Sequence, residues 1–191
     1  MKIASICLGP LATNCYLLEV GDRRVLIDPA EDSQALHDFV GDREIHAVVN
    51  THGHFDHVGG SWAFPQAPVW IHAADLPFFE AQHPDPPGTV HDLQPGTGIL
   101  DGVTVHHTPG HSPGSIILVA DGVLIVGDLL FAGSIGRVDL PGGSPNQMFD
   151  SLRWLVSLPG DYTVYPGHGE ATTLDVERKR NPFLIGLCEG P

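Results

Sequence analysis

The stretch THGHFDHVGG, residues 51–60, places three histidines and one aspartate within six positions, shortly after the apolar run AVV. His52 and His54 lie two positions apart, so an extended backbone would point both imidazoles to the same side. Asp56 and His57 follow at the turn, where the surrounding glycines allow the backbone to wrap around an ion. The stretch therefore predicts a metal site, and one loop could serve two adjacent metals.

Cysteine usage decides what kind of metal site is expected. A structural zinc site is usually closed by cysteines in pairs two to four residues apart. The three cysteines of this chain, Cys7, Cys15 and Cys188, form no such pair, and no H-E-x-x-H helix motif is present. The ligands are therefore histidines and carboxylates. Three scattered cysteines also favour a reducing compartment, so we expect a cytoplasmic protein.

Length and charge limit the function classes. A chain of 191 residues is long enough for one sizeable core, and we predict a single domain over residues 1–191. The formal net charge of −14 would repel a phosphate backbone, so nucleic acid is not an expected partner. No apolar run approaches the roughly 18 residues of a membrane helix, and the N-terminus is a poor signal peptide. Nothing in the composition predicts an oligomeric state.

Strand and helix patterns alternate along the chain. Predicted strands span Ile3–Cys7, Asn14–Val20, Arg24–Ile27, Ile45–Asn50, Val69–His72, Ile116–Ala120, Val123–Val126 and Tyr162–Tyr165. Predicted helices span Glu31–Val40, Ala73–Gln82 and Ser144–Leu158, with another from Asp175. Asp101-Gly102 and Asp121-Gly122 each predict a hairpin with a type I′ turn, the first joining Ile99–Leu100 to Val103–His106. This order suits two sheets packed face to face with helices outside, although other α/β layerings remain open.

Three later residues repeat one local design. His111, Asp128 and His168 each come directly after a glycine, and each follows an apolar strand pattern. The carboxyl ends of strands form the edge where binding sites gather in layered α/β folds. We therefore expect these three side chains to join the histidine loop.

Four motifs together resemble a known family. The segments THGHFDHVGG, TPGHSPGS, GDLLFAGSIGR and YPGHG are similar to the ordered motifs of the metallo-β-lactamase superfamily. More narrowly, they resemble its hydroxyacylglutathione hydrolase (glyoxalase II) branch, from about Asn14 to His168. The resemblance implies an α/β fold, the four-layer αβ/βα sandwich, in which two mixed sheets carry helices outside. It also implies a binuclear site between the two sheet edges.

The resemblance also implies a ligand set. One metal would be held by His52, His54 and His111. The other would be held by Asp56, His57 and His168, and Asp128 would bridge both. The two carboxylates, Asp56 and Asp128, would be catalytic residues as well as ligands. Such a site suits two divalent ions, with zinc preferred and iron or manganese as alternatives.

Two divalent ions about 3.5–4 Å apart can share a water and lower its pKa until hydroxide forms at neutral pH. The resemblance therefore implies hydrolysis of a small-molecule acyl thioester such as S-lactoylglutathione. One alternative is a persulfide dioxygenase-like enzyme with a single iron, held by His111, Asp128 and either His52 or His54. Another is a lactonase or esterase of the same superfamily.

Departures from the branch concern the substrate. Arg137 matches the family's basic position near the glycine carboxylate of glutathione, and we predict that it binds substrate. An equally open alternative is a structural arginine paired with Asp139 or with a loop carbonyl. Asp139 stands where the family has a tyrosine. Glu170 replaces a second tyrosine. Only 23 residues follow His168, so we do not expect the family's full C-terminal helical substrate domain in this chain.

Overall fold

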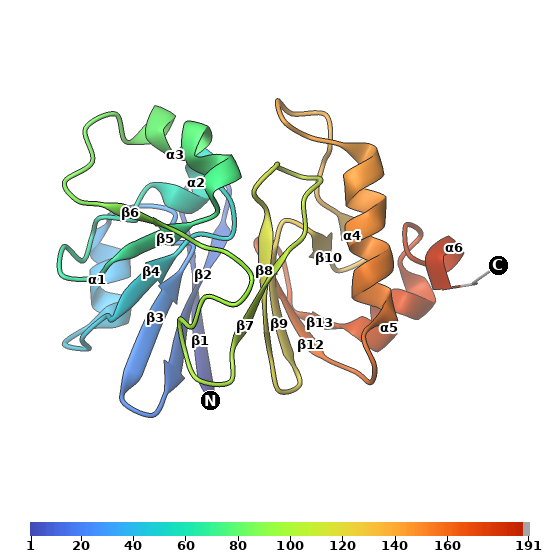
Figure 1. Cartoon of the computed structure of the whole chain (residues 1–191). Coiled ribbons are helices and arrows are strands. Elements are labelled where there is room, and N and C mark those ends of the chain that lie inside the picture. Colours follow the sequence, from blue (N-terminus) through green and yellow to red (C-terminus); the bar gives the residue numbers. More distant parts are fainter. Residues whose placement is uncertain (189–191) are drawn as a thin grey trace.

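The computed structural model describes residues 1–188, which form two β-sheets facing each other (Figure 1). The first sheet contains six strands in sequence order. They are β1 (Lys2–Leu8), β2 (Thr13–Val20), β3 (Arg23–Ile27), β4 (Ala47–Val49), β5 (Val69–Ile71) and β6 (Val90–Asp92). The pairs β1–β2 and β2–β3 are antiparallel, whereas β3 to β6 run parallel. The parallel strands bring several loops to one edge of this sheet.

The second sheet is also mixed and has the order β13-β12-β9-β8-β7. Its strands are β7 (Thr104–His107), β8 (Ile116–Ala120), β9 (Val123–Gly127), β12 (Thr163–Pro166) and β13 (Thr172–Thr173). Only β12 and β9 pair in parallel, so these two strands end at the same edge. A two-stranded ribbon, β10 (Leu130–Phe131) and β11 (Ser134–Ile135), follows β9.

Helices cover the outer faces of both sheets (Figure 1). The first half carries α1 (Gln34–Val40), α2 (Phe55–Val58), the 3-10 helix η1 (Ala73–Asp75) and α3 (Leu76–Gln82). The second half carries α4 (Pro145–Ser157), α5 (Leu174–Arg180) and α6 (Ile185–Cys188). Ser144 caps α4 by accepting from the backbone N–H of Gln147, and Pro145 occupies the first turn, as predicted. No helix of the described residues is long and apolar enough to cross a membrane.

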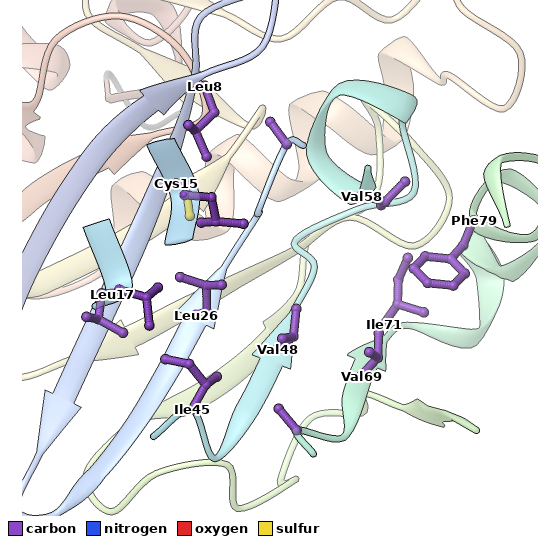
Figure 2. Close-up of a cluster of buried hydrophobic side chains, with 14 residues drawn as sticks. Leu8, Cys15, Leu17, Leu26, Ile45, Val48, Val58, Val69, Ile71 and Phe79 are labelled. Atoms are coloured by element: carbon purple, nitrogen blue, oxygen red, sulfur yellow. The ribbon is translucent and has the colours of Figure 1, made fainter. Parts of the chain in front are cut away.

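Alternating side chains of the first sheet divide between two cores. Leu17, Leu26 and Val48 face outward, where they pack with Leu36 of α1 and Phe79 of α3 (Figure 2). The next residues along the same strands face inward, toward the second sheet. Full burial of a leucine contributes about 1.5–3 kcal/mol to the free energy of folding. Each face of the sheet therefore stabilises its packing against the neighbouring layer.

The second sheet is buried in the same two-sided way. Ile116 and Leu118 face the first sheet, in a cluster that also contains Val25 and Val49. On the opposite face, another cluster is formed by Ile117, Leu124, Val126 and Val164 with Met148, Leu152 and Leu155 of α4. Three cores separated by two sheets make four layers, which confirms the predicted αβ/βα sandwich.

The first predicted hairpin is wrong. Ile99 and Leu100 form no strand, and Val105 pairs with Leu118 of β8 instead. The reason is that residues 93–103 cross from one sheet to the other, and Ile99 and Leu100 are buried in the core between the sheets. Residues 90–92 form β6, which the sequence analysis missed.

The second hairpin exists, with Ala120 paired to Val123. Its turn is not type I′, because Gly122 has a positive φ while Asp121 does not. The helix predicted from Glu31 begins instead at Gln34, since Ser33 takes the cap position and accepts from the backbone N–H of Leu36.

Candidate metal centre

All seven predicted ligands meet at one edge of the sandwich. His52 and His54 follow β4, and Asp56 and His57 lie in α2. His111 follows β7 in the chain, Asp128 follows β9 and His168 follows β12. Their ligand atoms form three groups in which all atoms lie within 4.8 Å of one another: His52, His54 and His111; His52, His57 and Asp128; and Asp56, His57 and His168. The sheet edges therefore bring together what the sequence keeps up to 116 positions apart (168 − 52).

Asp128 stands between the two sides of this cluster. Its Oδ1 lies 3.4 Å from Nε2 of His57, and its Oδ2 lies 3.4 Å from Nε2 of His111. Oδ2 is also 3.6 Å from Nε2 of His168, which in turn lies 3.2 Å from Oδ2 of Asp56. The carboxylate can therefore contact ions on both sides.

Several atoms of the cluster are buried without a hydrogen-bond partner. They include Nε2 of His52, Nε2 of His57 and Oδ1 of Asp128. A buried polar atom without a partner costs free energy, so native proteins rarely leave three together. Neutral imidazole nitrogens and carboxylate oxygens are suitable ligands for divalent transition metals. The orphaned atoms come from one of the three groups and fit such an ion.

The outer nitrogens of three histidines are held by the protein. Nδ1 of His57 lies 2.9 Å from Oδ2 of Asp28. Nδ1 of His111 lies 2.8 Å from the carbonyl oxygen of Arg137, and Nδ1 of His168 lies 3.1 Å from that of Leu11. An acceptor at Nδ1 places the proton there and leaves the Nε2 lone pair free, as in most histidine metal sites. These three rings are thus oriented to offer Nε2.

His54 is oriented differently. Its Nδ1 lies 2.8 Å from Nε2 of His111, so Nδ1 is the atom that faces the cluster. His54 also forms the N-cap of α2 without a side-chain capping bond. The ring is consequently free of helix capping and directed to the group formed with His52 and His111.

Two glycines allow the ligand loops to approach each other. A Cβ on Gly127 would lie 2.4 Å from Oγ1 of Thr51, and Gly127 has φ +48°. A Cβ on Gly167 would lie 2.2 Å from Oδ1 of Asp128. Both contacts are far below van der Waals distance, so only glycine fits before Asp128 and His168.

Charges within the cluster shift several pKa values. Burial would lower the pKa of His57, but Asp128 and Asp28 outweigh it and raise this pKa to about 9. Burial and nearby His111 lower the pKa of His54 to about 4. For Asp56, burial would raise the pKa, but the hydrogen bond with His168, the nearby charge of His57 and smaller contributions together outweigh it, and the pKa falls to about 2. Asp56 is thus ionised at neutral pH, and the imidazoles of His54 and His57 differ in how readily they lose a proton.

Comparison with known proteins places this geometry in a family. The sequence profile of the Metallo-beta-lactamase superfamily matches residues 8–168, which include every residue of the cluster. The chain belongs to the metallo-β-lactamase superfamily.

Relatives within the superfamily carry more specific names. The probable metallo-hydrolase YqgX of Bacillus subtilis (strain 168) is 30% identical, over 98% of this chain and 99% of YqgX. Hydroxyacylglutathione hydrolase GloC of Haemophilus influenzae (strain ATCC 51907 / DSM 11121 / KW20 / Rd) is 31% identical, over 96% of this chain and 98% of GloC. The crystal structure of TTHA1623 in a di-iron-bound form has 41% identity and a TM-score of 0.88, over 95% of this chain and 100% of that chain.

Asp28, which no sequence motif singled out, supports the ligand loop through His57 and Thr51. Besides His57, its carboxylate accepts from the backbone N–H and from the hydroxyl of Thr51, both at 2.7 Å. Asp28 is buried, and its φ of +50° is unusual for a residue with a side chain. A signal existed, because Asp28 follows an apolar strand directly, as Asp128 nearly does.

Asp75 was also missed, and no local signal could have revealed it. Its Oδ2 accepts from the backbone N–H of Gly53 at 2.8 Å and from the hydroxyl of Ser112 at 2.6 Å. Its Oδ1 accepts from the backbone N–H of Gly114 at 2.6 Å. Asp75 therefore ties the His52–His54 loop to the loop that carries His111, across the two halves of the sandwich.

A cavity of about 720 Å³ opens over the cluster, and Arg137 lines it. The guanidinium of Arg137 is paired side-on with Asp139: Nε donates to Oδ1 at 2.7 Å, and Nη2 donates to Oδ2 at 2.8 Å. Both residues are exposed. In the C-terminal tail, Arg178 donates to the carbonyl oxygens of Val156 and Gly160, outside this cavity.

Proposed function

We propose that this protein is a metal-dependent hydrolase of small acyl thioesters, with two divalent ions held at the seven-residue cluster. The observation that carries the proposal is the meeting of two ligand groups at one carboxylate. His111 lies on one side of Asp128 and His57 on the other, each 3.4 Å from a different oxygen. A single ion would not require both groups.

When bound, two such ions supply an activated water at neutral pH and withdraw electrons from a carbonyl group. The protein side chains prepare this chemistry. Asp28 and the carbonyl oxygen of Arg137 hold the rings of His57 and His111, so their Nε2 atoms face inward without reorganisation. Asp56 remains ionised at neutral pH, so it would balance part of the positive charge of the ions and could accept a proton from water.

The cavity provides space for a substrate beside the cluster. Its wall contains His54, Asp56, Asp128 and His168 on the cluster side, so a substrate in the cavity reaches the metal-binding residues directly. A volume of about 720 Å³ lies within the range of about 300–1,000 Å³ typical of small-molecule sites. The similarity to GloC supports a thioester as the electrophile, and the di-iron-bound relative supports a two-metal site.

We further propose zinc as the first metal to test, with iron and manganese as alternatives, since the ligand types alone do not select among them. The substrate would be a small molecule. The formal charge of −14 disfavours nucleic acid.

Two measurements on the purified full chain test the proposal. Elemental analysis after supplementation with each metal should approach two ions per chain. Hydrolysis should then be followed with thioesters, including S-lactoylglutathione, beside matched oxygen esters and lactones. Thioester turnover that depends on two ions supports the proposal. Preference for a lactone or oxygen ester contradicts the substrate class. One iron per chain with oxygen uptake instead identifies the persulfide dioxygenase alternative.

A further inference from the structure

The cavity over the cluster is mainly apolar beyond the ligand residues. Its apolar wall consists of Leu11, Phe55, Phe78, Phe131, Ile135 and Leu140. Leu11 and Phe55 are 52% and 55% exposed, although large apolar side chains are usually covered. Exposed apolar side chains beside a polar reaction site are typical of a surface that binds an apolar ligand.

Arg137 is the only arginine or lysine that lines this cavity among residues 1–188. Its Nε–Nη2 edge, one of the two edges that can bind a carboxylate with two hydrogen bonds, is taken by Asp139. The pair carries no net charge. A substrate carboxylate would therefore have to displace Asp139 or lie close to it, and like charges at that distance repel.

The geometry points to a substrate preference, which rests on the proposed thioesterase function. We infer that the cavity takes thioesters with an apolar, uncharged chain and that Asp139 is a specificity-determining residue. By occupying Arg137, Asp139 disfavours thiol portions that carry a carboxylate, glutathione among them. The apolar wall then supplies the binding free energy that a carboxylate contact would otherwise provide.

Binding of stable thioethers tests this inference without turnover. The probes are the S-hexyl thioether of 3-mercaptopropanoic acid and its methyl ester, which differ by one carboxylate. Calorimetric titration of the metal-loaded wild-type protein should show tighter binding of the ester. Asp139→Asn should tighten binding of the acid about three- to tenfold, since a charged hydrogen bond at an exposed site becomes available. The ester should respond much less.

Asp150→Asn is the matched control for this variant. Asp150 forms a comparable exposed ion pair with Arg153, 2.8 Å between Oδ1 and Nη1, on α4. Neither residue lines the cavity. This control carries the same change in net charge, so a general electrostatic effect would appear in both variants. Only Asp139→Asn should change the ratio of acid to ester binding.

The apolar wall is tested with methyl-ester thioethers of increasing chain length. Each added methylene that enters the cavity should tighten binding by up to about fourfold. Phe55→Ser should reduce the dependence of affinity on chain length. Phe149→Ser changes an exposed phenylalanine on α4 and should leave this dependence intact. Leu11→Ser provides a second test outside the ligand loop, in case Phe55→Ser alters metal content.

Equal binding of acid and ester by the wild-type protein overturns the role of Asp139, as does an unchanged ratio in Asp139→Asn. Affinity independent of chain length overturns the apolar preference. These outcomes are separate from the failure of the proposed function, because the probes contain no thioester bond, and recovery of the unchanged methyl ester after each titration shows that it was not hydrolysed. Ester binding with the predicted chain-length dependence but no thioester turnover would contradict only the proposed chemistry.

Discussion

The two halves of the sandwich contribute to the metal cluster in different ways. The first half supplies four ligands from one loop and one short helix, residues 52–57. The second half supplies three, His111, Asp128 and His168, one after each of three different strands. In the first half, local backbone geometry therefore sets most ligand spacings. In the second half, strand pairing and sheet packing set them.

Two buried carboxylates reflect this difference. Asp28 binds only first-half groups, Thr51 and His57. Asp75 instead bonds to Gly53 in the first half and to Ser112 in the second. The comparison suggests that one half of the site can be organised by itself, whereas the other depends on closure of the sandwich.

The largest expected effect breaks the contact between the halves. Asp128→Ala should lower kcat/KM for a thioester by about 10³-fold or more, because both ligand groups lose their shared carboxylate. It should also lower metal content below two ions per chain. His72→Ala and His106→Ala are the controls, since neither histidine lies in a metal group. Similar losses in all three variants, with folding intact, would show that Asp128 has no special place in the site.

The next prediction separates the two buried carboxylates. Asp28→Asn should weaken the binding of one metal by about 10–100-fold, because His57 loses a carboxylate acceptor at Nδ1. Asp75→Asn should lower mainly the affinity for the other metal, because the loops that carry His54 and His111 would be displaced. Stepwise metal titration of each variant can resolve the two ions. If both variants weaken the same ion, the division between the halves is incorrect.

A smaller effect is expected on the pH dependence of metal affinity, because metal binding should release a proton from His57. Chelated, metal-free protein should hold a proton on His57 at neutral pH, since Asp128 and Asp28 raise its pKa to about 9. A metal must displace this proton, and lower pH favours the proton, so affinity should fall about tenfold per unit as pH decreases from 8 to 7. Calorimetry in buffers of different ionisation enthalpy should show release of about one proton. A pH-independent affinity would contradict a role for His57 as a ligand.

The smallest expected effect lies at the rim of the cavity. Arg137→Ala should raise KM for S-lactoylglutathione about two- to threefold and change kcat less, because Asp139 already occupies the guanidinium. The carbonyl oxygen that accepts from His111 remains in this variant. A comparable loss of kcat with a thioester that lacks carboxylates would instead assign Arg137 to support of the site.

Much of the fold and of the candidate site could be predicted from the sequence. The buried strands that precede Asp128 and His168 end as their apolar patterns indicate, and the glycines before these residues are required by close contacts. The four layers were implied by the family resemblance, and in β2 successive buried side chains divide between the outer core and the core between the sheets. The connection near Ile99 could not be predicted, because its apolar residues are buried between the sheets without joining a strand.

The types of ligand and their positions after strands can be predicted from the sequence, since both depend on neighbouring residues. Which ligands face one another depends on the packing of the sheets, because this packing brings Asp128 between His57 and His111. It also revealed the role of Asp75, whose partners lie 22 to 39 positions away in both directions along the chain. For Arg137 the sequence left two alternatives open, and the structure shows the guanidinium paired with Asp139. Rotamers and long-range contacts settle such choices, and neither can be inferred from a local pattern.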